Sequence, residues 1–363
     1  MKNVLISGAS FAGLATAYWM NRSGYQVTIV EINQSIKKGG TPVNILEGTI
    51  DVVKRMGLFE QIAANQIRME RMEFKNALDE TERSEAHKKN EEYEIERDVL
   101  LDMMYNAVKN NVEIIYGDSI TSLTENNNGI DVTFRSNPSR TFDLVFGCDG
   151  IHSIVRKLWF GPETEFSRFL NIYFSISIVH KLLIPEYTTQ MYSEPGRTVM
   201  LNAYNGKTDI CFAYHSENEV SYDYRNDVQM RQMICDAFQR TGWRTPELLK
   251  EVAASETFYF DKLCQLKMPN WTKGRVALVG DAGYCASPAA GRGGSLAIDG
   301  AAALADAFEQ SDDDYQKAFK SYNTGFRPFV EQLQEDVVSY NLDALVPKDN
   351  EAIRKRNKEG FGF

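Results

Sequence analysis

Cysteine is scarce in this sequence, and its few copies form no arrangement that would bind a metal or build a disulfide framework. There is no Cys-x-x-Cys pair, and no cysteine joins the histidines in a cluster with metal-ligand spacing. We interpret the cysteines as free thiols of a reducing compartment and expect no metal site. They are Cys148, Cys211, Cys235, Cys264 and Cys285.

Long apolar runs and an excess of positive charge are also missing. No run reaches the roughly 20 residues that a membrane-spanning helix requires, so we expect no stable membrane insertion. The N-terminus shows no signal-peptide cleavage pattern and passes at once into a strand-like segment, which predicts a cytoplasmic protein. The net charge of −10 argues against a nucleic-acid partner.

The length and the apolar content are those of a globular protein with more than one core. A chain of 363 residues, 43% of them hydrophobic, predicts two closely joined lobes. We find no internal repeat, no Ser-His-Asp arrangement and no paired carboxylates for acid–base catalysis. We expect a monomer, with an oligomer left open.

The N-terminal segment shows the pattern of a dinucleotide-binding βαβ unit. A short apolar strand, a glycine turn, a helical pattern and a second strand follow one another before residue 31. Gly8 would make the tight turn, position 10 (Ser10) must be small so that a pyrophosphate can approach, and Gly13 would let helix and strand pack closely. Glu31 ends the second strand, where a carboxylate accepts hydrogen bonds from a ribose.

Two further strand ends have a similar organisation. The apolar run 275–279 ends in Gly280-Asp281, and Pro288 and three glycines then precede a helical pattern that opens at Ser295. Because glycines have no side chains, the backbone N–H groups at this helix start can approach a flat or anionic ligand. The other strand end leads into Asp149-Gly150 and a helix start.

Between these two strand ends the sequence alternates with a two-residue period and is rich in aromatic and β-branched residues, which predicts an antiparallel sheet. The predicted fold is mixed α/β, with a Rossmann-like nucleotide-binding lobe, an inserted antiparallel β-sheet lobe for the substrate and a C-terminal helix. The first lobe would comprise 1–68, 96–160 and 269–325, the second 69–95 and 161–268, and the C-terminal helix and tail 326–363. The predicted strands of the inserted sheet are 170–180, 199–204, 209–215 and 256–267, with helices over 228–240 and from 247.

Four smaller features were assigned from local composition. The charged stretch 81–94 is typical of a solvated loop or hairpin tip. Asp312 is expected to cap a helix, and Arg327-Pro328 to break or kink it. The charged segment 348–358 is expected to be a solvated end.

Three motifs now stand in order: Gly8-x-Ser10-x-x-Gly13 with Glu31, Asp149-Gly150 with Arg156, and Asp281 with its glycine-rich continuation. Together they resemble the class A, single-component FAD-dependent aromatic hydroxylases, over nearly the whole chain. Within this class the sequence is most similar to the flavin-dependent tetracycline-inactivating monooxygenases. The loop 39–42 and the spacing from Asp281 to Gly291 support that neighbourhood.

The resemblance implies a role for each matching residue. The glycine turn would hold the FAD pyrophosphate, Glu31 the adenosine ribose, and Arg97 would lie along the cofactor. Asp281 would bond the ribityl chain, and the segment after it would face the isoalloxazine ring. The motif of Asp149, Gly150 and Arg156 is tied to FAD placement and NAD(P)H use. The implied cofactor-binding residues are Gly8, Ser10, Phe11, Ala12, Gly13, Glu31, Arg97, Asp281, Pro288, Gly291, Gly293, Gly294 and Ser295.

The resemblance also implies the chemistry. NADPH or NADH would reduce the FAD, dioxygen would add to give a flavin C4a-hydroperoxide, and one oxygen would pass to an aromatic or polycyclic, polyketide- or antibiotic-like substrate. Antibiotic resistance is one possible role. No side chain is assigned as a certain catalyst, because the flavin carries the reaction.

The sequence departs from the family pattern inside the third motif. Tyr284 stands where the family usually has His, Arg292 where Gln is frequent, and Gly294-Ser295 where a bulkier residue and Asn are frequent. Candidate substrate-pocket residues lie on the predicted strands, and alternation allows only one parity of each strand to face the flavin. These candidates are Met200, Tyr204, Phe212, Tyr214 and His215.

Two alternatives remain open. One is an FAD-dependent reductase or dehydrogenase on the same fold, which would incorporate no oxygen into its product. The other is a non-catalytic FAD-binding module that acts through a partner. The intact first and third motifs argue against the second alternative.

Overall fold

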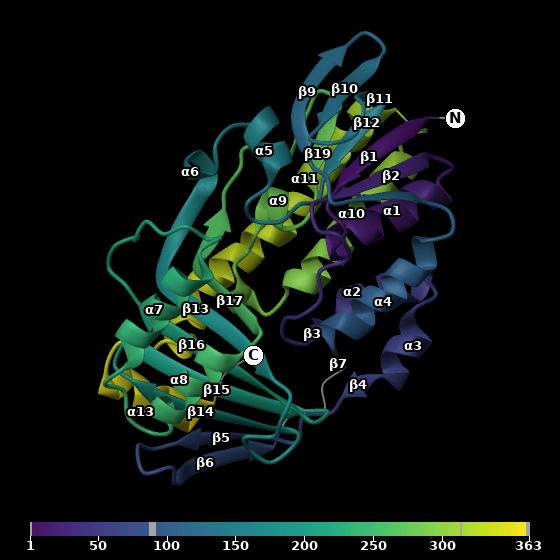
Figure 1. Cartoon of the computed structure of the whole chain (residues 1–363). Helices are drawn as coiled ribbons and strands as arrows, with labels where there is room; N and C mark the ends of the chain where they lie inside the picture. The colour runs from purple at the N-terminus through teal and green to yellow at the C-terminus, as the bar shows by residue number, and fades with distance from the viewer. Residues whose placement is uncertain (1, 87–91, 313, 361–363) are drawn as a thin grey trace.

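The computed structural model describes residues 2–86, 92–312 and 314–360, and shows the mixed α/β fold with two large sheets (Figure 1). The first has six strands in the order β18-β19-β12-β1-β2-β8, and every neighbouring pair is parallel except β18 with β19. Its central strands β1, β2, β12 and β19 are almost entirely buried, and buried parallel strands are rich in apolar residues. Its strands are β1 (Asn3–Ser7), β2 (Gln26–Glu31), β8 (Glu113–Tyr116), β12 (Leu144–Gly147), β18 (Thr272–Lys273) and β19 (Val276–Leu278).

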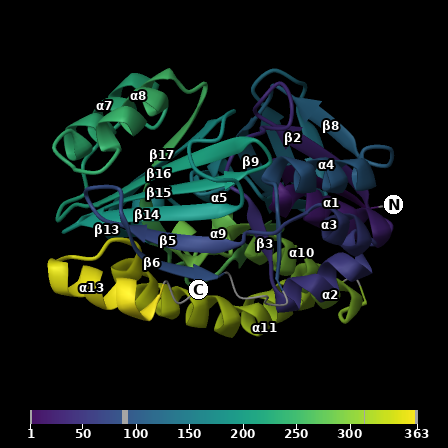
Figure 2. The ribbon, with the colours of Figure 1, turned by 90° about the horizontal axis from the view of Figure 1, so that it is seen from below.

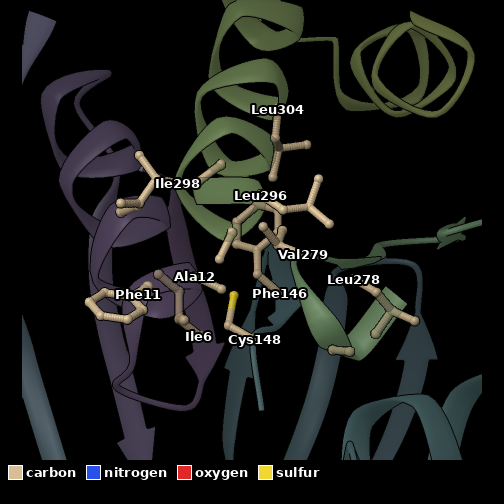
Figure 3. Close-up of a cluster of buried hydrophobic side chains, with 14 of the residues drawn as sticks. Ile6, Phe11, Ala12, Phe146, Cys148, Leu278, Val279, Leu296, Ile298 and Leu304 are labelled. Carbon is tan, nitrogen blue, oxygen red and sulfur yellow. The ribbon is translucent and has the colours of Figure 1, made fainter. Parts of the chain in front are cut away.

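Two helices, α1 (Phe11–Arg22) and α10 (Gly293–Glu309), pack on this sheet and on each other. Figure 3 shows where they meet, with Phe11 and Ala12 of α1 beside Leu296 and Ile298 of α10, over Phe146 of β12. All of these side chains are buried, so the apolar core lies directly behind the N-terminal turns of both helices.

This packing needs glycine at particular positions. A Cβ atom on Gly13 of α1 would lie 1.9 Å from the carbonyl oxygen of Gly8, and one on Gly280 would lie 3.1 Å from the Cβ of Ala12. The first distance excludes any side chain, so Gly13 allows the close approach of helix and strand that the sequence pattern predicts.

The second sheet has seven strands in the order β17-β13-β16-β15-β14-β5-β6 and is antiparallel except where β14 pairs with β5. Helices α7 (Asp227–Phe238) and α8 (Thr245–Ala254) cover one of its faces (Figure 2). The sheet consists of β5 (Arg71–Lys75), β6 (Thr81–Ala86), β13 (Ser167–Val179), β14 (Thr188–Glu194), β15 (Arg197–Tyr204), β16 (Lys207–His215) and β17 (Thr257–Leu266).

The two faces of this sheet differ in burial. Val199, Leu201 and Phe212 face α7 and α8 and are completely buried. On the opposite face, which we call the open face, Met200 and Cys211 lie opposite each other and are only partly buried. Protein atoms therefore cover one face of the sheet fully and leave the centre of the other accessible.

Helix α11 (Tyr315–Asp336) runs along both lobes and fastens them together (Figure 2). The side-chain amide of Gln334 donates to the carbonyls of Leu266 (2.9 Å) and Cys285 (3.0 Å). The helix is continuous across Pro328, so the predicted break there is wrong. Its N-cap is Asp314, which accepts from two backbone N–H groups, and not the predicted Asp312.

Two segments that were predicted to be solvated are ordered. Residues 81–86 form the edge strand β6, whose charged side chains suit an edge exposed to water, while the prediction for 87–91 lies outside the described residues. The charged segment near the C-terminus forms helix α13 (Asn350–Glu359) and packs against β14. Strand β14 was not predicted, because its buried residues include Thr188, Thr189 and Gln190.

The remaining elements are two small sheets and several helices. A three-stranded sheet of β9 (Ile120–Asn126), β10 (Gly129–Phe134) and β11 (Arg140–Phe142) extends from the first lobe, and a second small sheet of β3 (Val43–Ile45), β7 (Tyr93–Ile95) and β4 (Gln66–Ile67) lies beside α10. The other helices are α2 (Glu47–Arg55), α3 (Phe59–Ala64), α4 (Arg97–Val108), α5 (Ile154–Trp159), α6 (Glu163–Phe166), α9 (Asp281–Tyr284), α12 (Leu342–Leu345), the 3-10 turn η1 (Pro288–Ala290) and the π turn η2 (Val337–Asn341).

Arg356 explains why α13 is held in place. Its side chain is only 6% exposed and donates to Ser193 Oγ (2.8 Å) and to the carbonyl of Ala344 (2.9 Å), and its guanidinium lies 5.3 Å from the ring centre of Phe74. We predict that Arg356→Ala lowers the free energy of unfolding by about 1–3 kcal/mol, because it removes buried hydrogen bonds to a charged group.

Thermal or urea denaturation measures this loss, and Arg354→Ala is the matched control because Arg354 is exposed on the same helix. Equal stability of the two variants would contradict the packing role of Arg356.

Candidate functional site

The glycine turn between β1 and α1 presents unpaired backbone donors. Gly8 has a φ of +100° and donates its N–H to the carbonyl of Val30 (2.8 Å). The first intrahelical bond of α1 runs from the N–H of Leu14 to the carbonyl of Ser10 (2.8 Å). The N–H groups of residues 11–13, in the first turn of α1, therefore have no intrahelical acceptor, which is the arrangement that binds phosphate.

Arg97 brings a positive charge to the same turn. Its guanidinium donates to the carbonyl of Gly39 (2.8 Å) and to Ser10 Oγ (3.3 Å), and lies 5.4 Å from the ring centre of Phe11. A Cβ on Gly40 would lie 2.8 Å from Arg97 Cδ, so a glycine there leaves room for the arginine. The cation and the helix N-terminus converge on one anion site.

Glu31 lies at the end of β2 next to this anion site. One carboxylate oxygen accepts the N–H of Ala9 (2.9 Å), and the other accepts from the backbone (2.9 Å) and side chain (2.6 Å) of Asn33. Beyond it lies an open hollow of about 820 Å³. The hollow can receive the adenosine end of a dinucleotide, and it is lined by Asn33, Gln34, Ser35, Ile36, Lys37, Lys38, Asp102, Tyr105 and Tyr116.

The side chains of the second motif hold neighbouring backbone segments in place. Asp149 accepts from Ser7 Oγ (3.2 Å) and from the N–H of Ile154 (3.0 Å), so it joins β1 to the start of α5, while Gly150 takes a φ of +78°. Arg156 is 1% exposed and donates to the carbonyl of Ala282 (2.9 Å), directly after Asp281. The second motif thus holds the turn that carries the third, and its contact with a nicotinamide cofactor stays a prediction.

The third motif forms an accessible backbone platform. Asp281 begins α9, and burial raises the pKa of its carboxyl. Pro288, Gly291 and Gly293 are exposed, and the first intrahelical bond of α10 runs from the N–H of Leu296 to the carbonyl of residue 292 (2.7 Å). The N–H groups of residues 293–295 are therefore available at a helix N-terminus, where negative charge is stabilised.

Two residues of this platform contact β3. Ser295 donates its hydroxyl to the carbonyl of Asn44 (2.5 Å), and a Cβ on Gly294 would lie 2.4 Å from Val43 Cγ1. Gly294 is needed because β3 passes directly over the first turn of α10.

The departure at Tyr284 has a structural explanation. Its side chain is buried, and its hydroxyl lies 2.8 Å from the hydroxyl of Tyr322. A Cβ on Gly300 would lie 1.9 Å from the Tyr284 hydroxyl, so the glycine makes the space that the tyrosine fills. Tyr284 packs inside the core and does not reach the platform surface.

The predicted pocket residues divide between the two faces of the second sheet. Phe212 and Tyr214 pack against Phe238 of α7. Their ring centres lie 4.7 Å (Phe212) and 6.1 Å (Tyr214) from that of Phe238, so their prediction as pocket residues is wrong. Met200, Tyr204 and His215 share the parity of the open face. The alternation in the sequence separates the residues of each strand into two faces, but it does not show which face lies towards the flavin. Phe212 and Tyr214 were assigned to the pocket for that reason.

Tyr259 on β17 was missed by the sequence predictions. It is 43% exposed, yet its hydroxyl donates to Asp261 Oδ2 (3.1 Å) and burial raises its pKa well above the ordinary value. Tyr259 and Cys211 are both register partners of Ile176, so the accessible ring of Tyr259 lies on the open face. Since β17 alternates between the two faces, parity could have found it.

His152 links the second motif to this sheet. Its ring lies 2.9 Å (Nδ1) from Glu163 and 3.4 Å (Nε2) from Asp261, and stacks on Tyr224 with ring centres 4.5 Å apart. Burial alone would lower the pKa of His152, but the hydrogen bonds to Asp261 and Glu163 raise it to about 9. The histidine is therefore a cation at neutral pH between carboxylates of α6 and β17.

Comparison with known proteins agrees with this geometry. The family model described as an FAD binding domain matches residues 1–336. A flavin-dependent monooxygenase of Legionella longbeachae is 32% identical over 92% of this chain and 87% of its own. The chain belongs to the FAD-dependent monooxygenase family. A Mycobacterium tuberculosis protein is 35% identical over 98% of this chain and 97% of its own, and the crystal structure of tetracycline destructase Tet(51) matches with a TM-score of 0.89, 31% identity and coverage of 99% of this chain and 95% of that one.

The FAD-dependent monooxygenase therefore has a site that suits its cofactor. The anion site at α1, the hollow beside Glu31 and the platform at α10 would hold the pyrophosphate, the adenosine and the flavin ring respectively; these individual contacts remain predictions. Among the described residues, no helix is long and apolar enough to cross a membrane, and no cluster of three or more potential ligands could hold a metal ion.

Arg97 gives a direct test of the anion site. We predict that Arg97→Met raises the Kd for FAD about 10- to 100-fold, because it removes charge-assisted bonds to the pyrophosphate. The control is Arg55→Met, which removes a cation of the same lobe that is paired with Asp306. Isothermal titration of the apoprotein measures both, and an unchanged FAD affinity in Arg97→Met would refute the assignment.

His152 predicts a pH-dependent contribution to stability. Its folded-state pKa of about 9 lies above the ordinary value of 6.5, so its stabilisation is complete below about pH 6.5 and is lost as the pH rises through 9. His152→Gln should therefore be less stable than the parent protein at pH 6, and the difference should shrink towards pH 10. Denaturation at several pH values measures this, with His180→Gln, at an exposed position, as control; a constant difference would show that the charge is irrelevant.

Proposed function

We propose that this enzyme uses NADPH or NADH to reduce its FAD and transfers one oxygen atom from dioxygen to an aromatic or polycyclic small molecule. The bound FAD would accept the hydride and activate the dioxygen. The oxygen-transfer route implied by the sequence resemblance stays a prediction. We also propose the division into a cofactor lobe and a substrate lobe with the boundaries expected from the sequence.

The observation that carries this proposal is the accessible open face of the seven-stranded sheet. Met200, Cys211 and Tyr259 are accessible there, while the residues that flank Met200 and Cys211 in sequence, on the opposite face, are 0% exposed. Strand β17 of this sheet contacts α9, so the open face ends beside Asp281 and the platform. An apolar, partly aromatic wall next to a flavin platform suits a flat substrate.

The residues around the platform have definable tasks. The N–H groups at the start of α10 would stabilise negative charge that develops at the edge of a bound flavin. The sheet and the bridging helix α11 would limit the access of water to the reacting atoms. Backbone N–H groups and the shape of the site would carry out these tasks. This explains why no catalytic side chain stands out.

The similarity to tetracycline destructase Tet(51) supports a polyketide-like substrate and a role in antibiotic inactivation. The Tyr284, Arg292 and Gly294 departures do not argue against it. Tyr284 is internal, and Gly294 accommodates the passage of β3. A non-catalytic FAD module would share the cofactor site but would not need an open face beside the flavin platform. A reductase would need such a face as well, so incorporation of oxygen is what distinguishes it.

The experiment supplies the FAD-loaded enzyme with a panel of aromatic polyketides and tetracyclines under ¹⁸O₂, and records NADPH and NADH consumption together with product mass. We expect at least one compound to stimulate cofactor oxidation and to gain one ¹⁸O atom. Catalase in the assay excludes oxidation by released hydrogen peroxide. Products without ¹⁸O across the panel would favour the reductase, and failure to retain FAD would favour the non-catalytic module.

A further inference from the structure

Two carboxyl groups, those of Glu94 and Asp209, influence each other electrostatically, and the nearest cation, Lys207, forms its ion pair with Glu96. On β7, Tyr93 and Ile95 point into the main core, with the ring of Tyr93 centred 5.2 Å from that of Phe59, so Glu94 between them points towards the other side. Two residues further on, Glu96 pairs with Lys207 at the start of β16 and accepts from Asn205 (2.6 Å). The segment 94–96 thus runs alongside the hairpin between β15 and β16.

The same alternation places Asp209 opposite Glu94. Lys207 and Asp209 are two residues apart on β16 and share a face, so the pairing of Glu96 with Lys207 aligns Glu94 with Asp209. Lys207 is engaged by Glu96, and no described cation lies within ion-pair distance of Glu94 or Asp209. Burial raises the pKa of both carboxyls to about 7, and the charge of Glu94 contributes to the shift of Asp209.

Asp209 has an unused acceptor. Its side chain is 0% exposed; Oδ1 accepts the hydroxyl of Tyr204 (2.9 Å), and Oδ2 has no hydrogen-bond partner. A buried carboxylate oxygen without a donor costs free energy, which a donor supplied by a ligand would recover. Glu94 is only partly buried, so a ligand would approach the pair from the side of Glu94.

The pair lies close to the flavin platform. Glu94 is the register partner of Asn44 on β3, and the carbonyl of Asn44 accepts the hydroxyl of Ser295 at the start of α10. Only strand β3 separates the carboxyls from the first turn of that helix. On the sheet side, Asp209 is the register partner of Asn202, which belongs to the open face.

We propose that Glu94 and Asp209 form a subsite for a protonated amine carried by the substrate. An ammonium group would donate to the unpaired Oδ2 of Asp209 and would neutralise the repulsion between the two carboxylates. This inference rests on the proposed function, since it specifies one substituent of its polycyclic substrate. It assigns substrate recognition to residues that the family motifs do not include.

The test compares tetracycline with 4-dedimethylaminotetracycline, which lacks only the dimethylamino group. Binding to the oxidised, FAD-loaded protein is followed by the change in flavin absorbance, so it does not depend on turnover. We expect tetracycline to bind about tenfold or more tightly than its amine-free analogue. Glu94→Gln and Asp209→Asn should raise the Kd for tetracycline about 10- to 100-fold and change that of the analogue less than about twofold.

Asp236→Asn is the matched control, because Asp236 is an exposed carboxylate on α7, across the sheet from the open face. It should leave both Kd values unchanged. Equal binding of the two compounds by the parent protein, equal loss of both in the Glu94 and Asp209 variants, or binding of neither compound would overturn the amine subsite.

The outcomes for the two proposals are separable. Oxygen transfer without amine discrimination would refute the subsite and leave the monooxygenase function standing. Amine discrimination without oxygen transfer would support the subsite and refute the function. If Glu94→Gln and Asp209→Asn changed the thermal stability but preserved the ratio of the two Kd values, the two carboxyls would only share a proton with each other, and the amine subsite would be refuted.

Discussion

Close contact between backbone segments is the constraint on which this structure depends. Gly13 leaves no room for a side chain above the carbonyl of Gly8, and Gly280 brings the end of β19 against Ala12. These contacts set α1 and α10 side by side on one parallel sheet, with both N-termini at the carboxyl ends of its strands. Ligands bind at that edge of α/β sheets, and here two helix N-termini with unpaired N–H groups meet there.

This arrangement explains how an acidic protein can bind an anionic cofactor. The net charge is −10, but at the cofactor edge the helix N-termini and the guanidinium of Arg97 supply local positive potential. The carboxylates nearby have defined tasks: Asp149 accepts the N–H of Ile154 at the start of α5, and Glu31 accepts three hydrogen bonds beside the hollow. Glu94 and Asp209 form no ion pair with a described cation, and they lie where we propose that the amine of a substrate binds.

Much of the fold followed from the sequence because glycine spacing and apolar runs report local geometry. The βαβ unit and the glycine-rich segment after Asp281 were predictable in this way, whereas the role of Arg97 came only from the family resemblance. Features that depend on distant partners were not predictable. The sequence did not show which face of the sheet Phe212 and Tyr214 occupy. The polar helix α13 was taken for a tail because its anchors, such as Arg356, are polar side chains, and β14 was missed because several of its buried residues are polar.

The central claim is that the N-termini of α1 and α10 hold opposite ends of one FAD. A crystal structure of the FAD complex tests it most directly. It should show the pyrophosphate within hydrogen-bond distance of the backbone N–H groups of residues 11–13 and of Arg97, with the isoalloxazine ring between the first turn of α10 and the open face of the seven-stranded sheet. A pyrophosphate away from α1, or a flavin ring against α7 and α8, would contradict the account.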